Sequence, residues 1–241
     1  MTTDTIRSLK SYVSSADYHR PHTENEQLPF VSLSRQAGAG GITVSKLVRD
    51  RLEGANKGPR KWLCFDRDLL REVLNEHDLP QDLAGYMDET QYSAFLKWMD
   101  DAFSQRPTWS SLVQKTTETI RHLAHRGNVI IVGRGSSIVS RSLAGGVHVR
   151  LVSSHQKRIK HLRDYYEIDL DDAQRMRDRE DGGRAQYVKD YFDKNIEDAC
   201  LYDFVINTDH VSYEHAAHMI CERVQVMHDL LRTETRVLRA G

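Results

Sequence analysis

Residues 34–46 read SRQAGAGGITVSK, a glycine-rich stretch between an apolar segment and a helical pattern. A phosphate-binding loop usually reads Gly-x-x-x-x-Gly-Lys-Ser/Thr; its backbone N–H groups surround phosphate oxygens while the lysine neutralises the outer phosphates. Here Gly41 stands after Gly40, where the lysine would be, and Ile42 takes the Ser/Thr position. The stretch therefore has two interpretations, a phosphate loop that takes its cation from elsewhere or a glycine turn that packs a strand against its helix.

The segments on either side of this stretch favour a strand, then the loop, then a helix. PFVSLS at residues 29–34 predicts a short strand. After the glycines, apolar side chains recur at the spacing of an amphipathic helix, at Val44, Leu47, Val48 and Leu52. A strand, a glycine loop and a helix in succession are the context that a phosphate loop requires.

Four further apolar segments predict strands, and helical patterns separate them. The strand segments are KWLCFD at 61–66, NVIIVG at 128–133, GVHVRLVS at 146–153 and DFVINT at 203–208. Helical patterns cover 67–77, 80–126, the segments that begin at His155 and at Asp169, and 216–231. Asp169 with Asp172 resembles a capping pair at a helix start. Five strands that alternate with helices indicate an α/β fold with a doubly wound, five-stranded parallel sheet.

Length and charge exclude several classes of protein. With 241 residues the chain fits one large α/β domain, and its 34 basic against 35 acidic side chains create no overall field toward nucleic acid or a membrane. The sequence has no long apolar run, and its N-terminus lacks the apolar core of a signal peptide. Its three cysteines form no C-x-x-C pair, so neither a disulfide framework nor a zinc site is indicated. We therefore expect a cytoplasmic protein that binds neither nucleic acid nor membranes.

In such a sheet, ligands gather beyond the carboxyl ends of the strands. The polar residues at those ends are the glycine loop, Asp66 and Arg67, residues 133–137, Ser153 and Ser154, and Asn207 and Thr208. In the loop, Gly38, Gly40 and Gly41 let the backbone pass close to an anion, and the dipole of the helix that begins near Gly41 favours negative charge.

Arg134 stands between two glycines directly after the segment at 128–133. An arginine placed so, after a buried strand, is poorly placed to be a solvated surface charge, and its guanidinium matches phosphate geometry. We predict that Arg134 binds an anion; a structural ion pair is the alternative.

Two residues are candidates for holding magnesium. Thr43, like Ser45, offers a hydroxyl near the helix start, and Asp66 offers a carboxylate beyond the adjacent strand. Asp66 could equally be the N-cap of the helix that follows it, and both interpretations stay open.

Six blocks of sequence follow one another in a recognisable order. They are SRQAGAGG, FDRDLL, VIIVGRGSSIV, VHVRLVSSHQKRIKHL, DREDGGRAQYVKDYF and YDFVINT. Over residues 30–230 they resemble the cytidylate kinase-like family, relatives of the bacterial CMP kinases. The resemblance implies a P-loop NTPase-type kinase domain at 30–231, with a helical monophosphate-binding region at 67–127 and a basic lid at 170–195. Residues 1–29 would then be an N-terminal arm and 232–241 a C-terminal tail.

The same resemblance implies ATP and Mg²⁺ as cofactors and a CMP- or dCMP-like nucleoside monophosphate as acceptor. ATP would lie on Arg35, Ala37, Gly38, Ala39, Gly40, Gly41, Ile42 and Thr43. The acceptor would lie against Asp66, Arg67, Arg134 and Ser136, and the metal against Thr43 and Asp66. The residues that would carry the chemistry are Arg134, Arg179, Arg184 and Asp66.

The chain departs from the family pattern at two positions. Well-characterised CMP kinases carry the loop lysine and an Asp-Gly-Arg-Asp sequence after the third strand, whereas this chain has Gly41 and Val-Gly-Arg-Gly at 132–135. Phosphoryl transfer needs positioning and positive charge more than a covalent participant. We expect arginines to supply that charge: Arg134, the lid residues Arg179 and Arg184, and, within the loop, Arg35 rather than Lys46.

We therefore expect ATP-dependent phosphoryl transfer to a nucleoside monophosphate or a similar small phosphate acceptor. A kinase for a different small molecule is a further possibility. The main alternative is a nucleotide-binding protein that has lost catalysis and acts as a regulator or scaffold. In that case the arm at 1–29 would contact a protein partner or a second copy of the chain.

Overall fold

The computed structural model describes residues 27–55, 61–66 and 109–240. Their five strands form one parallel sheet with the order β2-β3-β1-β4-β5. The strands are β1 (Phe30–Arg35), β2 (Leu63–Phe65), β3 (Val129–Val132), β4 (Gly146–Val152) and β5 (Phe204–Asn207). Each lies on one of the five predicted segments, so the predicted α/β fold is confirmed.

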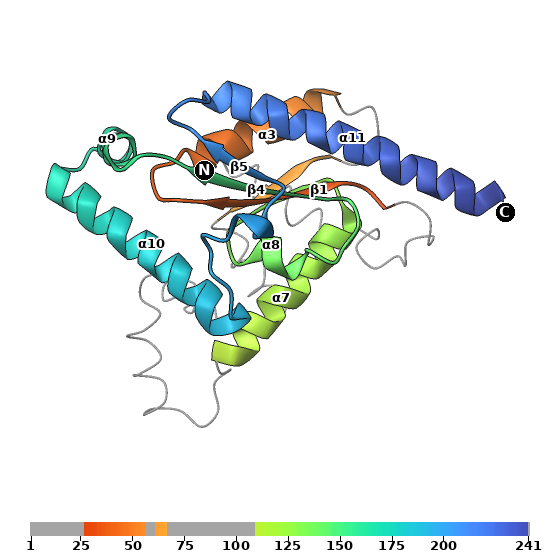
Figure 1. Cartoon of the computed structure of the whole chain (residues 1–241), viewed down its shortest axis with the longest axis horizontal. Helices are drawn as coiled ribbons and strands as arrows, with labels where there is room; N and C mark the ends of the chain where they lie inside the picture. Colours follow the sequence, from red (N-terminus) through yellow and green to blue (C-terminus); the bar gives the residue numbers. More distant parts are fainter. Residues whose placement is uncertain (1–26, 56–60, 67–108, 241) are drawn as a thin grey trace.

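Helices cover both faces of the sheet (Figure 1). On one face lie α3 (Gly41–Ala55) and α11 (Tyr213–Ala240); on the other lie α7 (Trp109–Arg126) and the short α8 (Ser136–Val139). The sheet is therefore doubly wound, as the alternation of strands and helices predicted.

The apolar run in β3 shows why the sheet needs helices on both sides. Ile130 and Val132 belong to a buried cluster with Val44 and Val48 of α3, whereas Val129 and Ile131 belong to a second cluster beneath α7. Because side chains alternate along a strand, a strand covered on both faces is apolar at every position. The run NVIIVG is buried for this reason.

Two helices extend from the sheet at the end where the glycine loop lies (Figure 1). They are α9 (His155–Tyr166) and α10 (Leu170–Phe192), and a turn of 3-10 helix (Ala199–Leu201) follows them. Asp169 is the N-cap of α10 and accepts a hydrogen bond from the backbone N–H of Asp172 at 2.7 Å, as predicted. A small buried cluster of Ala37, Ile159, Leu162 and Ala173 fastens both helices to the loop.

Helices α7, α10 and α11 lie in the predicted helical region, lid and C-terminal part of the chain. The predicted lid at 170–195 corresponds to α10 and three residues beyond it, and α7 is the described part of the region at 67–127. Helix α11 passes residue 231 and continues to Ala240, so residues 232–240 belong to this helix. Residues 1–26, most of the predicted arm, and 67–108 lie outside the described residues.

Candidate functional site

The glycine loop joins β1 to α3, and two of its glycines adopt backbone that favours glycine. Gly38 has φ +78° and Gly40 has φ +86°. A Cβ on Gly38 would lie 2.5 Å from the carbonyl oxygen of Arg158, and a Cβ on Gly40 would lie 2.3 Å from the ring of Tyr213. Both positions thus require glycine on conformational and steric grounds.

A cavity lies against this loop, which we call the loop cavity. It is lined by residues 35–38 and 40–43, by His161, Leu162, Tyr165 and Tyr166 of α9, and by Glu180 and Arg184 of α10. Because α3 begins at Gly41, the N–H groups of its first turn have no partner within the helix and carry the positive end of its dipole. This is the arrangement in which helix N-termini bind phosphate.

Of the predicted ATP-binding residues, Ala39 is the one that does not line the loop cavity. Its side chain is fully buried in the core, and its N–H donates to the carbonyl oxygen of Gln36 at 3.1 Å. Near it, the Ser45 hydroxyl donates to the carbonyl oxygen of Ile42 at 3.0 Å, whereas Thr43 lines the cavity.

Arg35, the last residue of β1, passes over the position of the missing lysine. Its Cγ lies 2.7 Å from the point where a Cβ on Gly41 would be. Its guanidinium Nη2 lies 3.7 Å from Oδ1 of Asp66, and its side chain is only 15% exposed. The side chain of Arg35 therefore occupies the space beside Gly41 that a lysine side chain at position 41 would enter.

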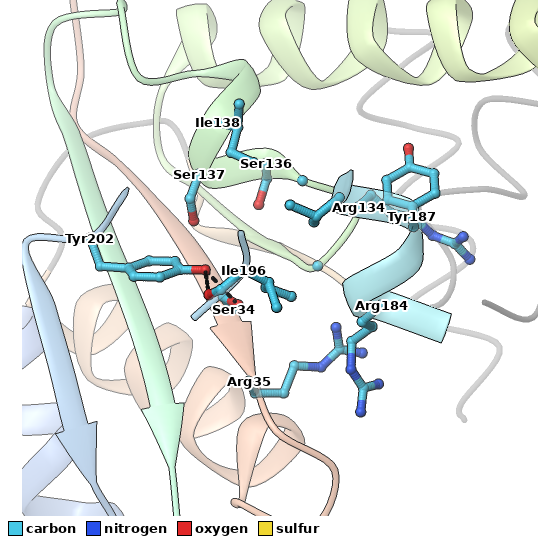
Figure 2. A pocket seen from close by; sticks show the side chains of 13 residues that line it. Ser34, Arg35, Arg134, Ser136, Ser137, Ile138, Arg184, Tyr187, Ile196 and Tyr202 are labelled. Carbon is cyan, nitrogen blue, oxygen red and sulfur yellow. Dashed lines mark hydrogen bonds between the residues drawn. The ribbon is translucent and has the colours of Figure 1, made fainter. Parts of the chain in front are cut away.

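A second cavity, which we call the arginine cavity, adjoins the first (Figure 2). Residues 34 and 35 of β1, residues 133–138, Arg184, Tyr187 and Val188 of α10, and Ile196 and Tyr202 line it. Three of these residues are arginines, and no carboxylate occurs among the described lining residues. Arg35 and Arg184 line both cavities, and Figure 2 shows their guanidinium ends directed to the same space.

The segment that carries Arg134 has an unusual backbone. Gly133, Arg134 and Gly135 follow one another with φ +81°, +55° and +67°. A left-handed conformation is uncommon for a residue with a side chain, and such backbone is held in place by its surroundings. Here the ring of Phe192 lies 2.5 Å from the position of a Cβ on Gly135, so α10 packs directly on the segment. Arg134 lines the arginine cavity beside Tyr187 (Figure 2).

One carboxylate of α10 connects this helix to the glycine loop. Asp181 accepts a hydrogen bond from the backbone N–H of Ala37 at 2.8 Å and one from Arg184 Nη2 at 2.8 Å. Its second oxygen accepts from Arg158 of α9. Burial alone would raise the pKa of the Asp181 carboxyl, but the hydrogen bonds from Arg184, Ala37 and Arg158 outweigh burial and lower the pKa below its ordinary value.

The structure separates the two lid arginines that the sequence grouped together. Arg184 is buried and pairs with Glu180 at 3.2 Å and with Asp181. Arg179 is exposed and lines neither cavity. The two are five residues apart in one helix, about 140° around its axis, so they cannot face the same site.

The remaining predicted site residues are placed as follows. Ser136 is buried in the wall of the arginine cavity, where its hydroxyl donates to the carbonyl oxygen of Ile131 at 3.4 Å. Arg67 lies outside the described residues, as does the helix that Asp66 was expected to cap. Tyr187 is buried and its ring contacts Tyr191 and Phe192.

Asp66 fits the role of a single carboxylate ligand to magnesium. Its Oδ1 is buried and has no hydrogen-bond partner among the described residues, although Arg35 is near. Magnesium bound to a nucleotide takes most of its ligands from phosphates and water and one or two from carboxylates. Within the described part of the chain, no group of three or more His, Cys, Asp or Glu side chains could hold a metal by itself.

Sequence reasoning missed several residues of the two cavities. Asp181 and Arg158 form the connection between loop and lid, and His161 and Tyr165 line the loop cavity. Tyr202 closes the arginine cavity, where its hydroxyl donates to Ser34 at 3.3 Å and to the carbonyl oxygen of Ile196 at 2.9 Å. The spacing of His161 and Tyr165, four residues apart in an expected helix, was the signal available for two of them.

Comparison with known proteins gives three findings. The model of a family described as cytidylate kinase-like matches residues 30–210. The crystal structure of an uncharacterized protein from Eubacterium ventriosum aligns with a TM-score of 0.60 at 17% identity, over 82% of this chain and 98% of that one. A shikimate kinase from Acinetobacter baumannii in complex with shikimate aligns with a TM-score of 0.42 at 14% identity, over 83% and 94%.

No curated protein matches the sequence. None of the described helices combines the length and the apolar character that a lipid bilayer would require.

Proposed function

Because the chain belongs to the cytidylate kinase-like family, we propose that it transfers the γ-phosphoryl group of ATP to a small phosphate-bearing acceptor of the nucleoside monophosphate class. The observation that carries this proposal is the junction of two cavities at Arg35 and Arg184. One cavity contains the glycine loop and a helix N-terminus, which suit a triphosphate. The other contains three arginines, which suit an anionic acceptor. Phosphoryl transfer takes place where two such ligands meet.

Each group at the junction has a task in this proposal. The N–H groups at the start of α3 would hold the donor phosphates, and Arg134 would hold the acceptor. Arg184 would stabilise the charge on the transferring phosphoryl group from a fixed position, because it is buried and held by Glu180 and Asp181, and Arg35 would add its charge from the end of β1. Preorganised charge and in-line positioning are the main requirements of this reaction.

Magnesium, when bound with ATP, would neutralise the charge of the phosphates, and Asp66 would be the carboxylate that holds it. Arg35 would then exchange its pairing with Asp66 for the phosphates. The observation that supports this exchange is the 3.7 Å separation of the pair, which is long for a charge-assisted hydrogen bond.

The activity can be tested with purified protein, Mg²⁺ and ATP against a panel of nucleoside monophosphates that includes CMP and dCMP. We expect ADP and a new nucleoside diphosphate to appear together with one or a few acceptors. The control is a chain with Arg35→Ala, which retains the glycine loop but loses the cation. ADP formation that does not depend on any acceptor, or that is equal in the variant, would contradict the proposal.

A second candidate function is a nucleotide-binding regulator without catalysis. Two observations favour it: Gly41 replaces the loop lysine, and the Asp181 carboxylate accepts from the N–H of Ala37 within the glycine loop. A carboxylate on that N–H would oppose an incoming phosphate. Thermal stabilisation by Mg²⁺-ATP together with no turnover on any acceptor would favour this second function over the kinase.

A further inference from the structure

We propose that α9 carries the nucleobase-binding surface for the phosphoryl donor, with the ring of Tyr165 as its stacking platform and His161 as the support of that ring. The inference rests on the proposed function, because it assigns the base of the nucleotide whose phosphates lie on the glycine loop. It names a surface on α9, outside the loop and outside the arginine cavity.

The first observation is that one cavity contains both surfaces. The loop cavity is lined at one part by Gly38, Gly40 and Gly41 and at another by His161 and Tyr165. A nucleotide whose phosphates follow the glycine loop therefore has an aromatic wall within the same space. The arginine cavity, by contrast, is lined by Tyr187 and Tyr202, and both of these tyrosines are buried.

The second observation is the exposure of Tyr165. Its side chain belongs to a cluster of rings, yet the residue is 51% exposed. His161 lies nearly parallel to it, with ring centroids 5.9 Å apart and planes 20° apart, and Tyr166 meets it edge-on at 4.9 Å. Neighbours therefore fix the ring while half of its surface stays open, which is the condition for stacking a planar ligand.

The third observation is that this cluster is anchored to the phosphate loop at two places. Tyr166 packs on the buried cluster that contains Ala37 of the loop. The ring of His161 meets Tyr213 at 5.9 Å, and the ring of Tyr213 lies over Gly40. The distance between the platform and the phosphate loop is therefore set by the packing contacts of Tyr166 and His161.

The charge state of His161 is compatible with this role. Burial lowers the pKa of the His161 imidazole, and the nearby Asp164 carboxylate only partly opposes that effect. A lowered pKa favours the neutral imidazole, which presents an aromatic ring to Tyr165. Stacking on such rings tolerates any base, because every base has a π-face.

The test compares ATP with inorganic tripolyphosphate, which has phosphates but no base. Calorimetry with Mg²⁺ would measure both ligands on the full chain and on two variants, Tyr165→Phe and Tyr165→Leu. Phenylalanine keeps the ring, and leucine keeps apolar bulk without a π-face. We expect ATP affinity to be kept in the phenylalanine variant and to fall about 5- to 150-fold in the leucine variant. Tripolyphosphate should bind equally to all three proteins.

Three other outcomes would decide against the platform, and they can be told apart. Unchanged ATP affinity in the leucine variant would overturn the platform and leave the proposed function standing. Parallel loss of ATP and tripolyphosphate would overturn it as well, because Tyr165 would then support the loop and not the base. Absence of binding of both ligands to the natural chain would overturn the proposed function itself, and the platform with it.

Discussion

The Cγ of Arg35 lies 2.7 Å from the place where a Cβ on Gly41 would be. A side chain at position 41 and the present path of Arg35 therefore exclude each other. A glycine at position 41 is thus a condition for this conformation of Arg35. As a result, the cation enters the loop cavity from the strand instead of from the helix, next to Asp66.

This relationship predicts the effect of restoring the lysine. We expect Arg35→Ala to lower kcat about 10²- to 10³-fold, as removal of a preorganised donor does. Gly41→Lys alone should be neutral or harmful, since its side chain would displace Arg35. The double variant should recover part of the lost turnover because the space is then free. The kcat for acceptor-dependent ADP release distinguishes these variants. A large gain from Gly41→Lys alone would show that Arg35 does not replace the loop lysine in the natural chain.

A second prediction separates two arginines outside the loop. Arg134 lines the arginine cavity, whereas Arg179 is exposed and lines neither cavity. We expect Arg134→Ala to raise the KM for the acceptor about 10- to 150-fold with little change in ATP affinity, because it removes a charge-assisted hydrogen bond to the acceptor. Arg179→Ala is the matched control and should behave like the natural chain. Steady-state kinetics and ATP calorimetry measure both variants. Equal effects of the two substitutions would contradict the different positions of Arg134 and Arg179.

A third prediction concerns two glycines with opposite surroundings. A methyl group on Gly40 would meet Tyr213 at 2.3 Å on backbone with φ +86°, whereas the Cβ position of Gly182 in α10 has no described atom within 4 Å. We expect Gly40→Ala to cost about 1–2 kcal/mol from its backbone alone and to weaken ATP binding. Gly182→Ala should stabilise the fold by about 0.5–1 kcal/mol and leave ATP affinity unchanged. Urea unfolding and calorimetry measure both; equal responses would contradict the special role of the loop glycine.

The sequence was sufficient to predict the sheet because its signals are local. NVIIVG is apolar at each of its strand positions, and a strand buried on both faces requires that composition. The start of α10 was predictable for a similar reason, since the Asp169 side chain bonds a backbone N–H only three residues away. The four-residue helix α8 was not, because it is too short to show a helical period.

Which residues line the two cavities was predictable where they adjoin a strand end and not where distant segments meet. Arg35 ends β1, and Arg134 and the loop glycines come directly after strands, so topology alone brings them to one edge. The contact between Ala37 and Asp181 joins residues 144 positions apart. In the sequence alone, a carboxylate among arginines suggests an exposed, solvated side chain. Likewise, the sequence of the lid did not show that only one of its two arginines would be buried.

The Asp181 carboxylate, which joins α10 to the glycine loop, makes the stability of the fold depend on pH in the acid range. The pKa of its carboxyl is lower in the folded chain than its ordinary value of about 3.8. A group of this kind stabilises the fold at pH values above its unfolded pKa, and the stabilisation is lost as the pH falls through the folded pKa. The sensitive window therefore begins near pH 3.8 and extends downward.

Asp181→Asn should remove this dependence, because an amide keeps the shape of the side chain but does not titrate. We expect the natural chain to have the higher Tm at pH 7 and its advantage over Asp181→Asn to shrink as the pH falls below about 4. Asp209, whose pKa is lowered to about 2, titrates in both proteins, so the comparison cancels its contribution. Asp178→Asn is the control, since the Asp178 side chain is 66% exposed and pairs with its neighbour Arg177. Calorimetric Tm values at pH 7 and between pH 5 and about 2.5 decide: parallel curves for the natural chain and Asp181→Asn would show that this carboxylate does not fasten the lid to the glycine loop.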